Sequence, residues 1–382
     1  MTEKPYLDFY GARGIIPVQQ NTDDLALHYA RRRALYRHLG IAPLALKNRT
    51  AIELGPGTGD NALYTAFCSP SRLVLVDGNP ASLKAVAEKI AAGQLPKESV
   101  ECRQADILQY QDRDRYDFVF CEGVIPLQKN PAAFLSRIAS FAGPDGIVVA
   151  TTMSPASVLA ESCRRILKPA FSRHFSDEPS LIKELVHFFT PDLQSLPGMS
   201  RRHEDWVLDN IVYPWPARCT FTIPDAIATL DSAFDLLGTS PVFIQDWRWY
   251  KAIPQHAQVW NAVAREAYSG WGGYLMDYRV APRQPASLSA TVLDALCQNA
   301  IDIQTRICAQ NSYAELPAFF DSLQKIREKI AAWLPQTATA IDDFITGAKP
   351  LMNEKLPADM GTFRGWFGRG QQYVSFVRRP GS

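Results

Sequence analysis

Short apolar runs alternate with helical stretches between Thr50 and Thr152, and this alternation limits the folds that the chain can adopt. Five runs, among them TAIEL (50–54) and RLVLVD (72–77), have the length and β-branched content of buried strands. Segments with helix-start signals separate them, such as Asn79 followed by Pro80. Nearly continuous apolar strands that alternate with helices are typical of a parallel sheet covered on both faces. We therefore predict an α/β fold with a doubly wound, mostly parallel sheet.

Two further strands are needed to complete this sheet. The alternating patterns of VFIQDWRWY (242–250) and QQYVSFVRR (371–379) predict an antiparallel pair, and the segment 224–238 before them predicts a helix. The seven-stranded core would then comprise three pieces, 50–153, 223–253 and 361–382. Helical patterns dominate the remaining segments, 154–222 and 254–360, which we interpret as two insertions. Insertions at the carboxyl edge of an open α/β sheet lie over the ligand crevice, so we expect them to form a lid.

Composition excludes some classes of function. The 382 residues carry a formal net charge of +1, which gives no general attraction for nucleic acid or an anionic membrane. No stretch approaches the roughly 20 apolar residues of a spanning helix, and the first residues do not resemble a signal peptide. The seven cysteines form no CxxC pair, and no histidines have a metal-ligand spacing. We predict a cytoplasmic protein with reduced thiols and no metal site; the sequence does not predict its oligomeric state.

The first strand ends in a glycine loop that carries acids. Gly55, Gly57 and Gly59 follow Glu53 in the sequence ELGPGTGD. Glycines at the first strand-to-helix turn allow a sharp turn and the close approach of a ligand. A dinucleotide-binding loop would have glycine where Asp60 stands, and a P-loop would continue with lysine and serine or threonine. A pyrophosphate would be repelled by Glu53 and Asp60, so the pattern favours a cationic ligand without phosphate.

The loop E-x-G-x-G-x-G at 53–59 resembles motif I of the class I methyltransferases, which bind S-adenosylmethionine. Asp77 ends the second strand, Asp106 follows the third, and the fourth, YDFVFCEG, resembles the strand whose end faces the sulfonium methyl group in this family. The resemblance implies that Glu53 favours the positive charge, that Asp77 accepts the ribose hydroxyls, and that Asp106 and Ile107 contact adenine. The predicted cofactor-binding residues are Glu53, Gly55, Pro56, Gly57, Thr58, Gly59, Asp77, Gly78, Asn79, Asp106, Ile107, Glu122, Gly123 and Tyr10.

Methyl transfer needs an oriented acceptor and sometimes a general base. The candidate catalytic residues are Glu122, at the end of the fourth strand, and His203, in the sequence RRHEDW; a salt-bridged helix start is the alternative interpretation of that sequence. Residues 1–49 are interpreted as a helical segment over the cofactor site. Arg31–Arg33, within it, are interpreted as a solvated helix face. Cys121 is interpreted as a thiol packed in its strand rather than a nucleophile.

The resemblance implies methyl transfer, and the insertions favour a small acceptor such as a sugar derivative or secondary metabolite, methylated on oxygen or nitrogen. One alternative is a methyltransferase that acts on RNA or protein. A second is transfer of an aminopropyl group on the same scaffold. A third is a binding module that keeps the fold without catalysis. Nucleic acid is the less favoured partner because the chain as a whole has no basic excess.

Overall fold

The computed structural model describes residues 9, 22–199, 201–215, 219–245, 247, 249, 251 and 257–381. The chain divides into two compact units. Unit 1 comprises Met1–Thr152, Phe221–Arg265 and Gln372–Ser382, and unit 2 comprises Met153–Thr220 and Glu266–Gln371. Helix α12 (Ala257–Trp271) is shared between them. The chain therefore leaves unit 1 twice and returns twice.

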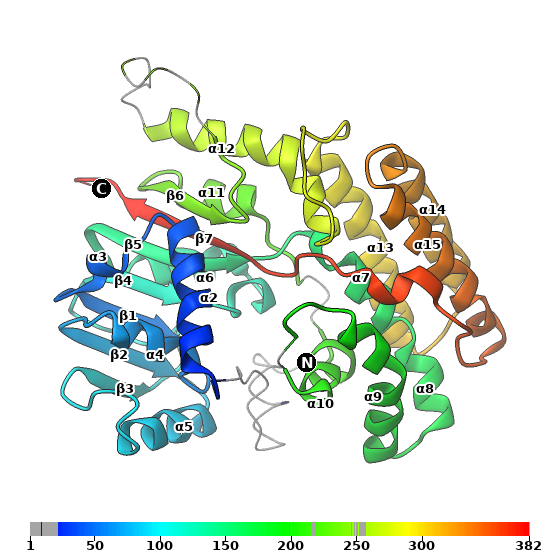
Figure 1. Ribbon diagram of the computed structural model, residues 1–382, viewed down its shortest axis with the longest axis horizontal. Helices are drawn as coiled ribbons and strands as arrows, with labels where there is room; N and C mark the ends of the chain where they lie inside the picture. Colours follow the sequence, from blue (N-terminus) through cyan, green and yellow to red (C-terminus); the bar gives the residue numbers. More distant parts are fainter. Residues whose placement is uncertain are drawn as a thin grey trace. The chain divides into compact units, whose positions relative to one another are not determined.

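Unit 1 is built on a single seven-stranded sheet (Figure 1). Its spatial order is β3-β2-β1-β4-β5-β7-β6. The strands are β1 (Thr50–Leu54), β2 (Arg72–Asp77), β3 (Val100–Gln104), β4 (Tyr116–Cys121), β5 (Ala142–Thr152), β6 (Phe234–Ser240) and β7 (Gln372–Arg378). The pairs among β1 to β5 are parallel, and β7 is antiparallel to both of its neighbours, with Ile147 opposite Val377. The predicted α/β fold with a mostly parallel seven-stranded sheet is confirmed.

Both faces of this sheet are buried, as the continuous apolar strands predict. The helices of unit 1 are α2 (Leu25–His38), α3 (Pro43–Leu46), α4 (Asp60–Phe67), α5 (Pro80–Ala91), α6 (Pro131–Ala139) and α11 (Ile223–Leu230), with the short 3₁₀ turn η1 (Ile125–Leu127). Leu73 and Leu75 pack in one cluster with Tyr36 of α2 and Tyr64 of α4. The residue between them, Val74, is equally buried on the opposite face. Alternate residues therefore serve two apolar layers.

The predicted sixth strand is wrong. The strand is Phe234–Ser240, which had been predicted as the end of a helix, and α11 stops at Leu230. Its backbone groups pair with β7, so a partner more than a hundred residues away overrides the local helical pattern. In the predicted strand 242–250, Trp247 and Trp249 are 88% and 65% exposed, so their alternation does not reflect burial against a helix.

Unit 2 is entirely helical in the part of the chain that the structure describes. Its helices are α7 (Pro155–Arg165), α8 (Lys168–His174), α9 (Glu178–Gln194), α10 (His203–Val207), α13 (Ala290–Gln310), α14 (Leu316–Ile330) and α15 (Pro335–Ala348), with the short turns η2 (Leu208–Val212), η4 (Gly272–Met276), η5 (Lys349–Asn353) and η6 (Gly361–Gly365). Among the described residues, no helix combines the length and apolar character required to span a bilayer.

An ion pair lies in the middle of unit 2. Arg164 of α7 is fully buried and donates from Nε to Asp192 of α9 at 3.0 Å, and Arg364 of η6 donates to the other oxygen of Asp192 at 2.8 Å. The Arg164 guanidinium also lies 3.8 Å from the ring centroid of Phe367. Both carboxylate oxygens and the guanidinium thus have partners, as buried charges require. This network ties the first segment of unit 2 to the second.

We expect Gly238→Ala to destabilise unit 1. A Cβ at Gly238 in β6 would lie 2.6 Å from the carbonyl oxygen of His38 and 2.8 Å from the backbone of Leu39. Because these are backbone atoms, relief requires a shift of β6 against α2, at a cost of about 1–3 kcal/mol. Thermal unfolding checks this. Gly143→Ala in β5 is the control, because its Cβ would meet nothing closer than 3.5 Å. Equal melting temperatures for the two variants would contradict the expectation.

Candidate functional site: the carboxyl edge of the sheet

The order of the strands places a ligand crevice between β1 and β4. From β1 the chain continues to β2 on one side, and β4 pairs with β1 on the other. The direction of strand order reverses at this point, and ligands of open α/β sheets bind outside the carboxyl ends of the strands there. Acids lie at three of these ends, with Glu53 in β1, Asp77 at the end of β2 and Glu122 directly after β4.

The glycine loop after β1 leaves open space at its centre. Gly55, Gly57 and Gly59 have φ values of 79°, 56° and 77°, in the left-handed region that favours glycine. A Cβ at Gly55 would lie 2.8 Å from Val124, and one at Gly59 would lie 2.9 Å from Val86. Among the residues that the structure describes, none has a heavy atom within 4 Å of a Cβ at Gly57. The outer glycines are therefore required for packing, and the middle one borders a space that a ligand could enter.

The loop is held by hydrogen bonds within its own turn and to its neighbours. The Gly59 amide donates to the Pro56 carbonyl at 2.9 Å. The Thr58 hydroxyl donates to Asp60 at 2.6 Å, and Lys89 pairs with the other oxygen of Asp60 at 3.1 Å. Pro56 and Thr58 thus shape the loop, and the carboxylate of Asp60 is engaged at the start of α4.

Asp77 connects β2 to the glycine loop. Its Oδ2 accepts from the Gly57 amide at 3.2 Å, and its Oδ1 accepts from the Asn79 amide at 2.8 Å. Burial raises the pKa of Asp77, although hydrogen bonds from the backbone of Asn79, Gly57 and Gly78 oppose the shift. Asn79 also caps α5, since its side chain accepts from the Ala81 amide at 3.0 Å. Two of these donors, the Gly57 and Asn79 amides, lie at full hydrogen-bond distance, and a carboxylate with two such donors keeps lone pairs for others.

The turn after β3 lies against the same loop. The side chain of Asp106 accepts from the Leu108 amide at 3.1 Å, which fixes the turn. Ile107 lies 3.8 Å from the position of a Cβ at Gly55. The structure therefore brings Ile107, predicted to contact adenine, next to the glycine loop.

Glu53 is the most unusual acid of this edge. It is 3% exposed, and its Oε2 has no hydrogen-bond partner among the residues that the structure describes. The pKa of Glu53 is raised to about 8, first by burial and then by the charge of Glu122, with Arg32 opposing. An unsatisfied buried carboxylate is costly, and a cation brought to it would relieve the cost. This oxygen fits a ligand with positive charge and does not fit a phosphate.

Glu122 is held by a residue that the sequence interpretation missed. Its two oxygens accept from Arg32 of α2 at 2.7 and 2.8 Å, and Asn61 of α4 adds a third bond at 3.1 Å. Both side chains of the ion pair are 7% exposed. The interpretation of Arg31–Arg33 as a solvated face is therefore wrong for Arg32. One signal was available, because Arg32 lies four residues from both His28 and Tyr36, which form the buried face of α2.

Other predicted residues occupy different environments. Gly123 has a φ of 78°, and its amide donates to Thr151 at 2.8 Å, which fixes the turn after β4. His203 lies in unit 2, where its Nδ1 contacts the Thr190 hydroxyl at 3.1 Å. Tyr10 lies outside the described residues. Cys121 is fully buried, and burial raises the pKa of its thiol, which makes it a poor nucleophile. The catalytic assignments of His203 and Glu122 remain predictions.

Comparison with known families now identifies the domain. A protein-family model described as "Methyltransferase domain" matches residues 45–210. The chain carries a methyltransferase domain. The seven-stranded sheet to which residues 45–210 contribute agrees with the resemblance of the glycine loop to the class I methyltransferases, which use S-adenosylmethionine. The matched segment contains all the acids of the carboxyl edge described above.

Several solved structures resemble parts of this methyltransferase. One is the N-methyltransferase NodS from Bradyrhizobium japonicum WM9, with 16% identity over 39% of this chain and 75% of that one (TM-score 0.32). Magnesium protoporphyrin IX methyltransferase from Synechocystis PCC 6803 has 15% identity over 40% and 73% (TM-score 0.33). PKMT2 from Rickettsia typhi has 16% identity over 62% and 49% (TM-score 0.44). A search of curated proteins found no match to this sequence.

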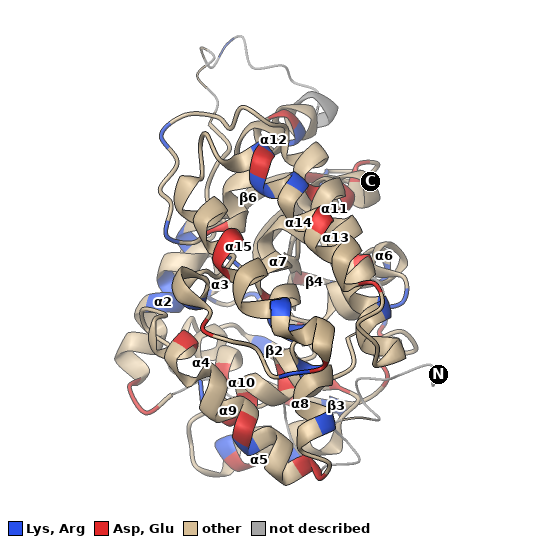
Figure 2. Cartoon of the chain, turned by 90° about the vertical axis from the view of Figure 1, so that its right-hand side faces the viewer, with Lys and Arg blue, Asp and Glu red and all other residues tan. Residues whose placement is uncertain are grey.

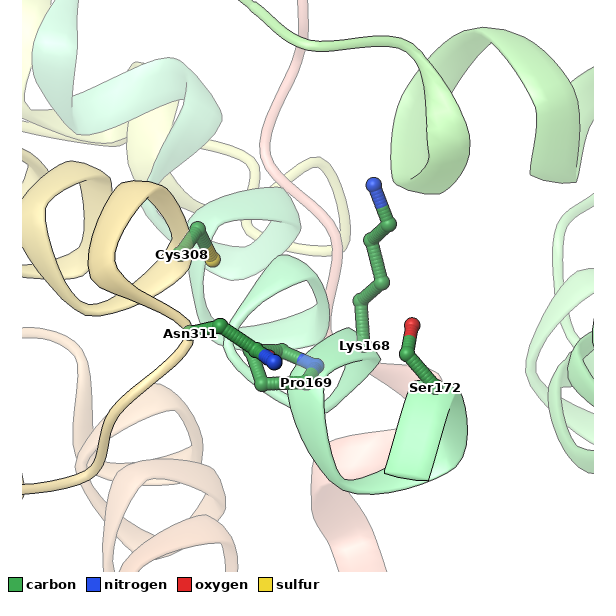
Figure 3. Close-up of a pocket in the computed structure, with 5 residues that line it drawn as sticks. All are labelled: Lys168, Pro169, Ser172, Cys308 and Asn311. Atoms are coloured by element: carbon green, nitrogen blue, oxygen red, sulfur yellow. The ribbon is translucent and has the colours of Figure 1, made fainter. Parts of the chain in front are cut away.

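A pocket of about 240 Å³ lies within unit 2 of the methyltransferase (Figure 3). Lys168, Pro169 and Ser172 of α8 line it together with Cys308 and Asn311 at the end of α13. The Lys168 ammonium donates to the Val212 carbonyl at 3.1 Å, and burial raises the pKa of the Cys308 thiol. Neither group is thus set up as a nucleophile here. Among the residues described, no three histidine, cysteine or acidic side chains gather in a way that could hold a metal ion.

Proposed function

We propose that this methyltransferase transfers the methyl group of S-adenosylmethionine to an oxygen or nitrogen atom of a small molecule. Two observations carry the cofactor side of the proposal. The buried Oε2 of Glu53 has no hydrogen-bond partner among the described residues, and those residues leave open space at Gly57 in the loop that follows. S-adenosylmethionine carries an ammonium and a sulfonium group and no phosphate, so an acid favours it where it would repel a nucleotide. When bound, the cofactor supplies a methyl group activated by the sulfonium.

In this proposal each residue of the carboxyl edge has a separate task. Glu53 attracts the positive charge, directly or through water. Asp77 accepts the ribose hydroxyls with the lone pairs that Gly57 and Asn79 leave free. Asp106 recognises the adenine amino group, and Ile107 lies beside the ring. The glycine loop 55–59 and residues 78, 79 and 123 provide backbone that the cofactor can approach closely.

The acceptor side of the proposal is supported by the size and charge of unit 2. Two long segments of the chain, rather than a short loop, form this helical unit. The segment 154–222 contains eight lysines and arginines and eight acids, and Figure 2 shows the two signs interspersed along the helices. Nucleic-acid binding depends on basic residues that neutralise phosphates, and such a balance does not favour it. We therefore propose that the two insertions form a lid over a small acceptor.

The proposal needs a group that takes the proton of the acceptor. Glu122 has both oxygens engaged by Arg32 and Asn61, so it is less available to contact an acceptor. His203 has one ring nitrogen at Thr190 and is only half-buried. We propose His203 as the base if the acceptor is a hydroxyl. For a neutral amine, proximity and orientation alone can suffice.

Two measurements test the proposed function. The melting temperature of the purified protein should rise when S-adenosylmethionine or S-adenosylhomocysteine is added, because a ligand that binds the native state stabilises it. A metabolite extract incubated with enzyme and cofactor labelled in the methyl group should yield a labelled small molecule and S-adenosylhomocysteine. Methylthioadenosine as the product would indicate aminopropyl transfer instead. Labelled RNA or protein with no labelled metabolite would refute the small acceptor, and an unchanged melting temperature would favour a binding module.

A further inference from the structure

The ion pair between Arg32 and Glu122 lies at the carboxyl edge of the sheet, where the proposed cofactor would bring its positive charge. Glu122 follows β4, and Glu53 lies near the end of the neighbouring parallel strand β1. The guanidinium binds the Glu122 carboxylate through two nitrogens, in the geometry that gives the strongest pairing of these groups. Both partners are almost completely buried, so solvent screens their charges little.

The other charged groups that face Glu53 are largely compensated. Asp60, at the start of α4, pairs with Lys89 and accepts from Thr58. Asp77, at the end of β2, accepts from two backbone amides, which stabilise its carboxylate without cancelling the charge. Tyr36 of α2 is buried with its pKa raised above its usual value, so it is neutral. Glu122 has its counterion in Arg32. Of the described acids at this edge named here, Glu53 alone has a buried oxygen without a hydrogen-bond partner among the described residues.

We propose that Arg32 is a positioning residue of the cofactor site, which cancels the charge of Glu122 and leaves Glu53 as the one acid available to a cationic ligand. The inference rests on the proposed function. S-adenosylmethionine carries one more positive charge than negative, and it loses that excess when the methyl group leaves. A site in which Arg32 cancels the charge of Glu122 and Glu53 keeps an oxygen for the ligand therefore matches the cofactor before transfer better than the product after it.

The proposal predicts opposite signs for two substitutions. Arg32→Met leaves the charge of Glu122 beside Glu53, which makes ionisation of Glu53 harder and moves the pH at which cofactor affinity levels off upward. Glu122→Gln leaves the charge of Arg32, which makes ionisation easier and moves this pH downward. Shifts of about one pH unit are expected when a buried charge that acts on Glu53 loses its counterion. The double variant has neither charge and should return close to the wild-type profile.

The experiment measures the affinity for S-adenosylmethionine by calorimetry between pH 6 and pH 9, in the full-length wild type and these three variants. Arg31→Met is the matched control, because Arg31 lies on the same helix and is exposed, and it should leave the profile unchanged. Melting temperatures without cofactor establish that each variant folds. If Arg32→Met does not fold, the test is made with Glu122→Gln alone. The pH at which its cofactor affinity levels off should then lie about one unit below that of the wild type, and an unchanged pH would overturn the proposal.

A purely structural role of Arg32 would lower the melting temperature without moving the pH profiles in opposite directions. Profiles that shift in the same direction, or not at all, or a double variant that differs from the wild type as much as Arg32→Met does, would overturn the inference. Failure of the wild type to bind the cofactor would instead refute the proposed function. The two failures are therefore distinguishable in a single series.

Discussion

Replacement of Asp77 by alanine will weaken the binding of S-adenosylmethionine by about 100-fold or more, which corresponds to about 3 kcal/mol. The substitution removes the acceptor of the Gly57 and Asn79 amides, so the glycine loop loses one of its anchors. It also removes the proposed charged acceptor of the ribose hydroxyls, and hydrogen bonds to charged groups contribute more than neutral ones. The first loss already loosens the loop in the free protein, and the second removes a contact that is made only when the cofactor is bound.

Calorimetry with S-adenosylmethionine and with S-adenosylhomocysteine checks this expectation, and both ligands should be affected alike because they share the ribose. Asp114→Ala is a suitable control. Its side chain is 58% exposed and bonded to Arg72, so its loss should leave cofactor affinity unchanged. An Asp77→Ala protein that melts as a folded protein and binds with wild-type affinity would show that the ribose lies elsewhere.

The affinity for S-adenosylmethionine will rise with pH up to about pH 8, by at most about tenfold per pH unit, and then level off. The reason is the pKa of Glu53, which burial and the charge of Glu122 raise to about 8. Below this pH the free protein holds a proton that a cationic ligand must displace. Above it Glu53 is already ionised, and no proton is released on binding.

The Glu53→Gln variant separates this effect from other titrations. Glutamine cannot ionise, so the variant should bind weakly at every pH, with a much flatter profile than the wild type. Its affinity should approach that of the wild type at low pH and fall behind it near pH 8. Parallel profiles for the two proteins would show that another group causes the pH dependence.

The same shift has a consequence for the stability of the free protein. Between the ordinary pKa of a glutamate and about 8, the native state holds a proton on Glu53 that the unfolded state has released. Stability therefore falls as the pH rises through this window, in contrast to a carboxylate paired with a cation. Glu53→Gln should remove this contribution, and denaturant unfolding at pH 5 and pH 8 measures it. A wild-type decrease no larger than that of the variant would contradict the assignment.

Local sequence patterns were sufficient to predict residue positions that depend only on where strands end and turns begin. The positions of Glu53, Asp77 and Asp106 follow from strands that end together at one edge, and the structure places them there. The pattern failed at Phe234–Ser240, where a helical sequence becomes a strand because β7 offers it a ladder of backbone partners. The sequence near residue 234 contains no pattern that would predict pairing with a strand at residues 372–378.

The misinterpretation of Arg32 has a related cause. Three consecutive arginines resemble a solvated face, and the counterion that buries one of them lies 90 residues away. Helical periodicity with Tyr36 could have placed Arg32 toward the sheet, but it could not have identified Glu122 as its partner. Sequence reasoning therefore placed these acids at one edge of the sheet and missed the arginine that pairs with Glu122.

The sheet of unit 1 can be completed only late in synthesis, because its last strand in the sequence, β7, lies between β5 and β6. The strand is inserted between β5 and β6, and its first residue, Gln372, lies opposite Thr152, 220 positions earlier. Until residues 372–378 leave the ribosome, β5 and β6 expose edges that can pair with other chains. The nascent polypeptide must therefore hold an unfinished sheet while all of unit 2 is being translated, and its last folding step closes a very long loop.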